Sequence, residues 1–219
     1  MKLRAPVYIC LILILAMSAV SLFGYLQLPD DARVAIHFGF TGQADGFAPK
    51  LPGLAVLPTI ALGLTLLMTV IPSIAPKRKG LEASSLAYGM TMIGVMMVLA
   101  ISQFALVAHA LDARFDVVRA IALACALLGL VLGNYLGKAR HNYVFGIRTP
   151  WTLADERVWD KTHRFTGRLM FLGGLVLAVA SFAAPDDRAL LAAVLACMIA
   201  PALAGVVYSG VIYPRGQDA

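Results

Sequence analysis

The sequence predicts an all-α integral membrane protein: a six-helix transmembrane bundle with an extended or hairpin outer loop and an amphipathic interfacial helix on the cytoplasmic side. Composition is the first reason. Of the 219 residues, 60% are hydrophobic and 14% are charged, whereas a soluble domain carries about 25% charged residues. The second reason is that the apolar residues form six uncharged runs, most of them long enough to cross a bilayer. A soluble fold could not bury this much apolar surface, so the expected solvent of these runs is lipid.

We expect these spans to form one membrane domain over residues 1–219. A helix needs roughly 20 apolar residues to cross a hydrocarbon core of about 30 Å. The fifth uncharged run is short, and its helix should start earlier, with Arg168 extending its guanidinium to the headgroups. The first run is longer than the roughly 7–15 residues of a signal h-region, which favours an uncleaved helix. The expected spans are residues 6–27, 53–75, 84–109, 119–137, 166–184 and 189–213, with an outer loop over 28–52 and an inner loop over 133–168.

The basic residues predict the orientation. With both termini inside, thirteen of the 18 lysine and arginine residues are cytoplasmic, in agreement with the positive-inside rule. The five expected outside are Arg33, Lys50, Arg114, Arg119 and Arg188. The predicted location is therefore a cytoplasmic membrane, with several passes and with the N and C termini in the cytoplasm. The net charge of +6 then reflects topology and contact with membrane lipids, and not direct binding of nucleic acid.

The interiors of the spans contain no Asp, Glu, Lys or Arg. Ionisable groups inside spans mark proton relays and ion pathways, so their absence argues against a proton-coupled pump while leaving a passive or lipid-handling path open. Gly129, Gly133 and Gly137 recur every fourth residue and predict a stripe where another helix approaches closely. Pro58 and Pro201 should kink the second and sixth helices.

The outer loop has the period of a β-strand. Apolar residues alternate with other types over residues 34–40, and Gly42 with Asp45-Gly46 supplies turn chemistry. We expect a short extended or hairpin element that either packs on the helices as a lid or pairs with an extended peptide by strand addition. His37 has no metal-ligand spacing around it and is expected to be a hydrogen-bonded structural histidine. The candidate partner-binding residues of this loop are His37, Phe38 and Asp45.

The inner loop contains an expected helix start. Thr149-Pro150 breaks the helical period and predicts an extended turn. Thr152 followed by Asp155 reads as a capping box, so a helix should begin near Leu153 and continue into the fifth span. Its basic residues recur at helical spacing and form one stripe, with tryptophans beside it. An amphipathic helix of this kind belongs at the membrane interface, where the tryptophans set its depth.

The residue types of the inner loop allow an enzymatic interpretation as well as a binding one. His141, Asp160 and His163 could form an acid–base or metal site. The neighbouring lysines and arginines disfavour a divalent cation and favour an anion, such as a lipid phosphate or a partner's carboxylate. No nucleophile–base pair or phosphate-binding loop is present. We therefore predict a protein that is not an enzyme, with no catalytic residue, no metal and no cofactor.

The inner loop also carries a family likeness. The stretch GNYLGKARHNYVFGIRTPWTLADERVWDKTHRFTGR, residues 133–168, resembles the signature of the SdpI family of bacterial multispanning membrane proteins. The outer stretch is similar to the N-terminal domain of unknown function often found in that family, through Leu28-Pro29, Ile36-His37-Phe38, Gly42 and Asp45-Gly46. The candidate ligand- or partner-binding residues of the inner motif are Asn134, Lys138, Asn142, Arg148, Trp151, Thr152, Trp159, His163 and Arg164.

The resemblance implies a role in immunity in a bacterial inner membrane. Such a protein would protect its cell from, or sense, a secreted hydrophobic toxic peptide, and some members of the family also control a cytoplasmic repressor. The implied partners are membrane lipids, a toxin peptide outside and a repressor-type regulator inside. The alternative is a transporter or lipid-handling protein that binds an anionic headgroup at the inner loop.

Overall fold

A computed structural model describes residues 3–76, 78–112 and 114–213. Lys2, Lys77 and Arg215, which contribute to the predicted orientation, lie outside the described residues. Six helices are long and apolar enough to cross a membrane, which confirms the predicted all-α membrane fold. They are α1 (Arg4–Gln27), α2 (Lys50–Ile74), α4 (Ser85–Leu111), α5 (Val117–Leu136), α7 (Glu156–Ala183) and α8 (Asp187–Val211).

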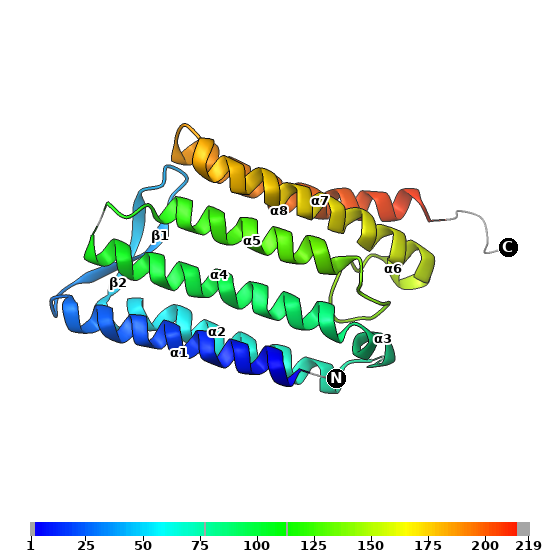
Figure 1. Cartoon of the computed structure of the whole chain (residues 1–219), viewed down its shortest axis with the longest axis horizontal. Helices are drawn as coiled ribbons and strands as arrows, with labels where there is room; N and C mark the ends of the chain where they lie inside the picture. The colour runs from blue at the N-terminus through cyan, green and yellow to red at the C-terminus, as the bar shows by residue number, and fades with distance from the viewer. Residues whose placement is uncertain (1–2, 77, 113, 214–219) are drawn as a thin grey trace.

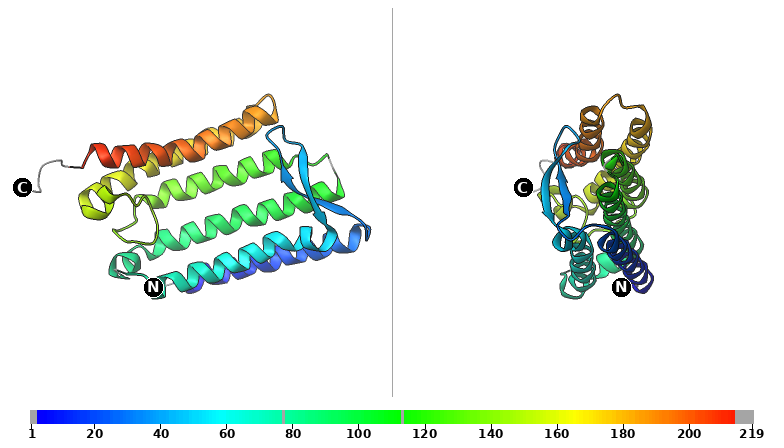
Figure 2. Two further views of the ribbon diagram at one scale, coloured as in Figure 1. Left: turned by 180° about the vertical axis from the view of Figure 1, so that it is seen from behind. Right: turned by 90° about the vertical axis from the view of Figure 1, so that its left-hand side faces the viewer.

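The long helices form a flat bundle. Figure 1 shows α1, α4, α5 and α7 side by side in one row, with α2 behind α1 and α8 behind α7. A two-stranded hairpin crosses the back of this row at one end of the bundle (Figure 2). The opposite end carries the short helices α3 (Arg78–Ala83) and α6 (Pro150–Ala154) and the loop of residues 137–149. We call these two ends the hairpin end and the motif end.

The hairpin is formed by β1 (Arg33–Phe38) and β2 (Ala44–Pro49), which confirms the expected hairpin in the first long loop. The strands pair antiparallel, with Val34 opposite Ala48 and an irregularity at His37. Val34 is fully buried in a cluster with Leu54 of α2 and Val107 of α4. The hairpin therefore packs on the helices as a lid, the first of the two arrangements considered for this loop.

The glycine stripe of α5 faces α7, as predicted. A Cβ added to Gly133 would lie 2.6 Å from Cα of Phe171, and one added to Gly129 would lie 3.1 Å from Cα of Gly174. These positions bring backbone against backbone, which is how helices associate where lipid removes the hydrophobic drive.

Two prolines inside α2 leave two backbone carbonyl groups without their usual N–H donor. Side chains of neighbouring helices donate hydrogen bonds to both carbonyl groups instead. Pro58 has no N–H for the carbonyl of Leu54, which instead accepts from Ser21 Oγ at 2.9 Å and Gln103 Nε2 at 3.1 Å. Pro72 likewise frees the carbonyl of Met68, which accepts from Tyr88 Oη at 2.7 Å. In lipid an unsatisfied carbonyl is costly because no water reaches it, so these bonds fix α2 against α1 and α4.

Replacing Tyr88 by phenylalanine should lower the stability of the protein by about 1 kcal/mol, the usual worth of a hydrogen bond between membrane helices. The substitution removes only the hydroxyl that satisfies the Met68 carbonyl. The midpoint of thermal unfolding in detergent measures the effect. The control is Tyr8→Phe, because Tyr8 is 64% exposed on α1 and its change should leave the midpoint in place. Equal midpoints for Tyr88→Phe and the wild type would contradict the role of this bond.

Candidate functional site

The loop of residues 137–149 at the motif end is organised by Asn142, which is completely buried. Its Nδ2 donates to the carbonyl of Arg140 at 2.8 Å, and its Oδ1 accepts from the backbone N–H groups of Val144 at 2.8 Å and Phe145 at 3.0 Å. The loop passes over α3 so closely that a Cβ on Gly80 would collide with the carbonyl of His141. Asn142 is thus a structural residue of the motif.

His163 and Trp159 join this loop to α7. His163 Nε2 accepts from the backbone N–H of Ile147 at 2.9 Å, and its Nδ1 lies 2.8 Å from the carbonyl of Trp159, to which it donates. Accepting at one nitrogen and donating at the other requires a neutral imidazole. The chain reaches this ring at Gly146, whose φ of +105° favours glycine and where a Cβ would collide with His163 Nε2.

Trp159 lies inside the protein. Its exposed fraction is 0%, its Nε1 donates to the carbonyl of Ala139 at 2.8 Å, and its ring stacks on His163 with centroids 4.0 Å apart. The predicted position of this residue at the membrane interface is therefore wrong, because its indole N–H finds its partner in the loop. Trp151 is 36% exposed and packs beside Gly210 at the end of α8.

The predicted helix start is also wrong. Thr149, and not Thr152, caps a helix, accepting from the N–H of Thr152 at 3.2 Å while Thr152 Oγ1 accepts from the N–H of Thr149 at 2.9 Å. This helix, α6, ends after one turn, and Asp155 then caps α7 by accepting from the N–H of Arg157 at 2.6 Å. The helix begins directly after Thr149 because Pro150 fits the first turn of a helix, where its missing N–H needs no partner.

A hydroxyl pair connects this segment to the last helix. Thr149 Oγ1 lies 3.0 Å from Ser209 Oγ, and both side chains are buried. The motif loop, the start of α7 and the end of α8 are therefore held together by side chains from all three.

The structure divides the predicted inner site into two groups. Asn142, Thr152, Trp159 and His163 are buried and hold the loop. The exposed members are Asn134, Lys138, Arg148, Trp151 and Arg164. Position along the chain does not separate the two groups, because both fall on the same short segment. Only the exposed group is free to meet a ligand.

The exposed basic side chains make few bonds. Arg148 donates to the carbonyl of Tyr143 at 2.9 Å, and Lys138 Nζ lies 4.4 Å from the centroid of the Tyr135 ring. Arg164 Nε donates to the carbonyl of Asp160 at 3.2 Å, and its Nη2 lies 4.0 Å from the carboxylate of the same residue. These contacts leave most of each cation open to solvent or headgroups.

The three residues of the enzymatic reading are engaged in other contacts. His141 Nε2 lies 3.1 Å from the carbonyl of Leu153, and His163 is held by backbone groups on both nitrogens. Asp160 lies between Arg140, at 3.8 Å, and Arg164. This geometry supports structural roles for both histidines.

Replacing Asn142 by alanine should loosen the motif loop, because the N–H groups of Val144 and Phe145, which are partly buried, lose their acceptor at a cost of about 1–3 kcal/mol. The rate of tryptic cleavage at Arg140 in detergent measures this and should rise. Asn134→Ala is the matched control, since Asn134 is exposed on α5 and lies outside the loop. Unchanged cleavage in both variants would show that the loop does not depend on Asn142.

At the hairpin end, the predicted residues His37 and Asp45 pair across the strands. His37 Nδ1 lies 2.5 Å from Asp45 Oδ1, and both side chains are exposed. This confirms a hydrogen-bonded histidine. Phe38 packs its ring against that of His109 in α4 in a T-shaped arrangement, with centroids 5.3 Å apart. The three residues therefore do not form one site.

Beside Phe38 lies a polar cleft of about 290 Å³ that the sequence did not reveal. Its walls come from the hairpin, the α4–α5 loop and the starts of α5 and α8, segments far apart in the chain. Arg114 lines it and binds Asp112 through its backbone N–H at 3.0 Å and its Nε at 3.2 Å. These bonds lower the pKa of Asp112, which favours its ionised form. The polar side chains lining the cleft are His109, Arg114, Asp116 and Asp187.

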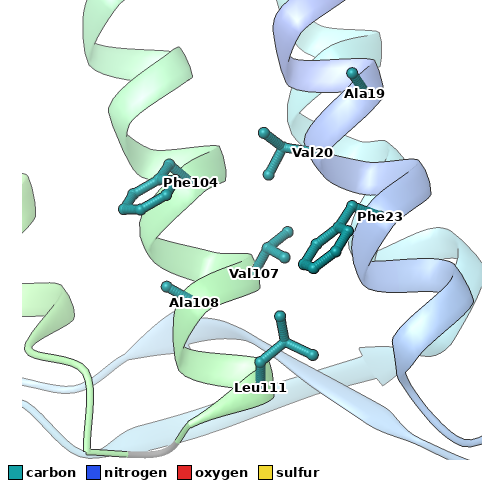
Figure 3. Close-up of a pocket in the computed structure, with 7 residues that line it drawn as sticks. All are labelled: Ala19, Val20, Phe23, Phe104, Val107, Ala108 and Leu111. Carbon is teal, nitrogen blue, oxygen red and sulfur yellow. The ribbon is translucent and has the colours of Figure 1, made fainter.

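An apolar groove of about 390 Å³ opens near the same end, between α1 and α4 (Figure 3). Phe23 and Phe104 stand on its two walls, and Leu111 lies at the end nearest the hairpin. Both phenylalanines are more than half exposed. The groove faces the lipid and offers an almost entirely apolar surface.

Two separate regions of the chain match known families. Residues 138–209 match the SdpI/YfhL protein family, and residues 12–62 match a domain of unknown function, DUF1648. The chain is 39% identical over 62 residues to the immunity protein SdpI of Bacillus subtilis (strain 168), covering 28% of this chain and 30% of the relative. It is 43% identical over 37 residues to the uncharacterized protein YfhL of the same organism, covering 17% of this chain and 34% of the relative.

The matched regions span about a third of the length of each of these relatives, and no solved structure matches the chain. The first match begins at Lys138 and takes in the motif loop, α6, α7 and most of α8. The second takes in most of α1, the hairpin and the first half of α2. The predicted resemblance is thereby confirmed: in this multi-pass bacterial membrane protein, residues 138–209 are similar to the SdpI/YfhL family and residues 12–62 to DUF1648.

Proposed function

We propose that this protein gives its bacterium immunity to a secreted hydrophobic toxic peptide, or senses that peptide, from the inner membrane. The name of the relative SdpI, an immunity protein, supports this role. The proposal depends on one observation: at the hairpin end, a lipid-facing apolar groove and a polar cleft both lie near the β1–β2 hairpin. A hydrophobic peptide arriving from outside would meet both.

The groove suits an apolar peptide segment for a physical reason. Inside a bilayer, contacts between helices depend on close packing because lipid chains are as apolar as the side chains. Phe23 and Phe104 offer large apolar walls, with Ala108 and Ala19 leaving room between them. The polar cleft then takes the part of the peptide that stays at the headgroup level, where charged partners such as Arg114 and Asp187 are available.

The proposed orientation places both termini and the motif end in the cytoplasm. There the exposed Arg148 and Trp151 would contact a repressor-type regulator. The hydroxyl pair between Thr149 and Ser209 connects this surface to α8, whose start, at Asp187, lines the polar cleft. Thus one helix reaches from the proposed peptide site to the proposed regulator surface.

A toxin challenge tests the immunity proposal. Cells with the chain should survive a candidate secreted hydrophobic peptide better than cells with an empty vector. Ala108→Trp, which fills the groove, should abolish the protection. Leu66→Trp is the control, because Leu66 is exposed to lipid on α2, and it should protect like the wild type. Equal killing by every candidate peptide with and without the chain would refute the proposal.

A transporter or lipid-handling role is the second candidate. The excess of exposed cations at the motif end favours it, since they attract anionic headgroups. The spans offer no charged residue midway to accompany a headgroup across, which is why immunity is preferred. Movement of a labelled anionic lipid between the leaflets of vesicles containing the protein would reverse this preference.

A further inference from the structure

We propose that the end of α5, the turn that follows it and α7 together bind the phosphate of an anionic membrane lipid at the motif end, through Asn134, Lys138, Arg164 and Arg168. This inference goes beyond the proposed immunity function and does not depend on it. The ligand is a lipid held at a fixed place, and no movement of lipid across the membrane is implied.

Close contacts place the four residues at one level. A Cβ on Gly137 would lie 3.2 Å from Cγ of Arg164, and a Cβ on Gly167 would lie 2.9 Å from the carbonyl of Gly133. The stretch 133–137, at the end of α5 and just after it, therefore runs beside 164–167 of α7. Side chains four residues apart share a face of a helix.

Four exposed polar side chains lie at this level. Asn134 is exposed on α5 and Lys138 in the turn that follows it, and Arg164 and Arg168 are exposed on α7, four residues apart. The groups that would meet a ligand are thus one amide, one ammonium and two guanidinium groups, all of which can donate hydrogen bonds.

The charge of this patch is not balanced. Asp160 is shared by Arg140 and Arg164 at 3.8 and 4.0 Å, distances too long for hydrogen bonds. Arg168 has no ion-pair partner among the residues that the structure describes, and Lys138 has only the Tyr135 ring. One carboxylate therefore faces several cations, and an anion is needed to complete the site.

The position of Arg168 indicates that the anion belongs to a lipid. On the same exposed line of α7 the next side chains are Leu172 and Leu175, which are 57% and 45% exposed and face the bilayer. An arginine on such a line directs its guanidinium to the headgroups, where phosphate is the acceptor. Guanidinium binds phosphate through two parallel hydrogen bonds, which gives the contact geometry as well as charge.

Native mass spectrometry of the full chain in a non-ionic detergent tests this site. Phosphatidylglycerol should bind and phosphatidylcholine should bind more weakly, because its choline cancels the charge. The double variant Arg164→Gln, Arg168→Gln should bind phosphatidylglycerol about tenfold less tightly, as expected when two charge-assisted contacts are lost. The double variant Arg164→Lys, Arg168→Lys keeps both charges and should therefore retain part of the affinity. The thermal midpoint should stay unchanged in all variants.

A matched control removes the same charge elsewhere at the motif end. Arg148→Gln with Arg157→Gln should leave the affinity within about twofold, because neither arginine belongs to the proposed site. A general charge effect depends on the number of cations and not on their place, and would lower the affinity of both double variants alike. If both double variants lose affinity equally, the proposed site is wrong. Inorganic phosphate at millimolar concentration should not displace the lipid. Full displacement would assign the cations to a soluble anion and overturn the lipid site.

Discussion

Replacing Gly133 by alanine is expected to force α5 away from α7 and to lower the free energy of unfolding by about 3 kcal/mol, the upper part of the range for overpacking a tight interface. The added Cβ would lie 2.6 Å from both Cα and Cβ of Phe171. Neither atom moves when the Phe171 side chain changes rotamer, because Cα is part of the α7 backbone and Cβ is bonded directly to it. The thermal midpoint of the purified protein in detergent measures the loss.

Gly63→Ala is the control for this experiment. Gly63 also lies within a long helix, α2, but a Cβ there would meet nothing within 4 Å. Alanine favours a helix over glycine by about 0.5–1 kcal/mol, so this variant should be as stable as the wild type or slightly more so. Similar losses in both variants would mean that glycine matters for reasons other than the α5–α7 contact.

Trp159→Ala is expected to have the largest effect at the motif end, a loss of about 3–5 kcal/mol as for other buried tryptophans. The substitution removes a fully buried ring, its stacking on His163 and its hydrogen bond to the carbonyl of Ala139. The loop should then open, since Ala139 lies at its start. Recovery of monodisperse protein and its thermal midpoint measure the outcome.

Trp151→Ala provides the comparison, because Trp151 is partly exposed and only borders α8. It should cost much less stability than Trp159→Ala. Trp151→Ala is also the more informative variant in a toxin challenge. Because the protein should stay folded, a change in protection would report on the proposed regulator contact. A larger loss of stability from Trp151→Ala than from Trp159→Ala would contradict the arrangement of the motif end.

Several features of the fold follow from local pattern. The six spans need only long uncharged runs, and the hairpin needs only alternation followed by Gly42 and Asp45-Gly46. The glycine stripe of α5 was likewise predicted, because small residues at every fourth position have few other uses in a span. In each case one stretch of chain contains all the information that the prediction requires.

The candidate site was harder to predict because burial decides its roles. Trp159 and Lys138 belong to the same motif, yet one is enclosed by the loop and the other is exposed. The helix start was misplaced since Thr149 and Thr152 both have capping side chains. The choice between them depends on Pro150 and on the contact of Thr149 with Ser209, sixty residues away.

Hydrophobicity and charge along the chain thus predict a membrane protein with six spanning helices. This is possible because the transfer of each uncharged apolar stretch into lipid depends on that stretch alone. The tertiary structure decides which motif residues support the loop and which meet a ligand. It also reveals the polar cleft and the apolar groove, whose walls come from segments far apart in the chain. Such assignments depend on contacts between distant segments, which no local pattern records.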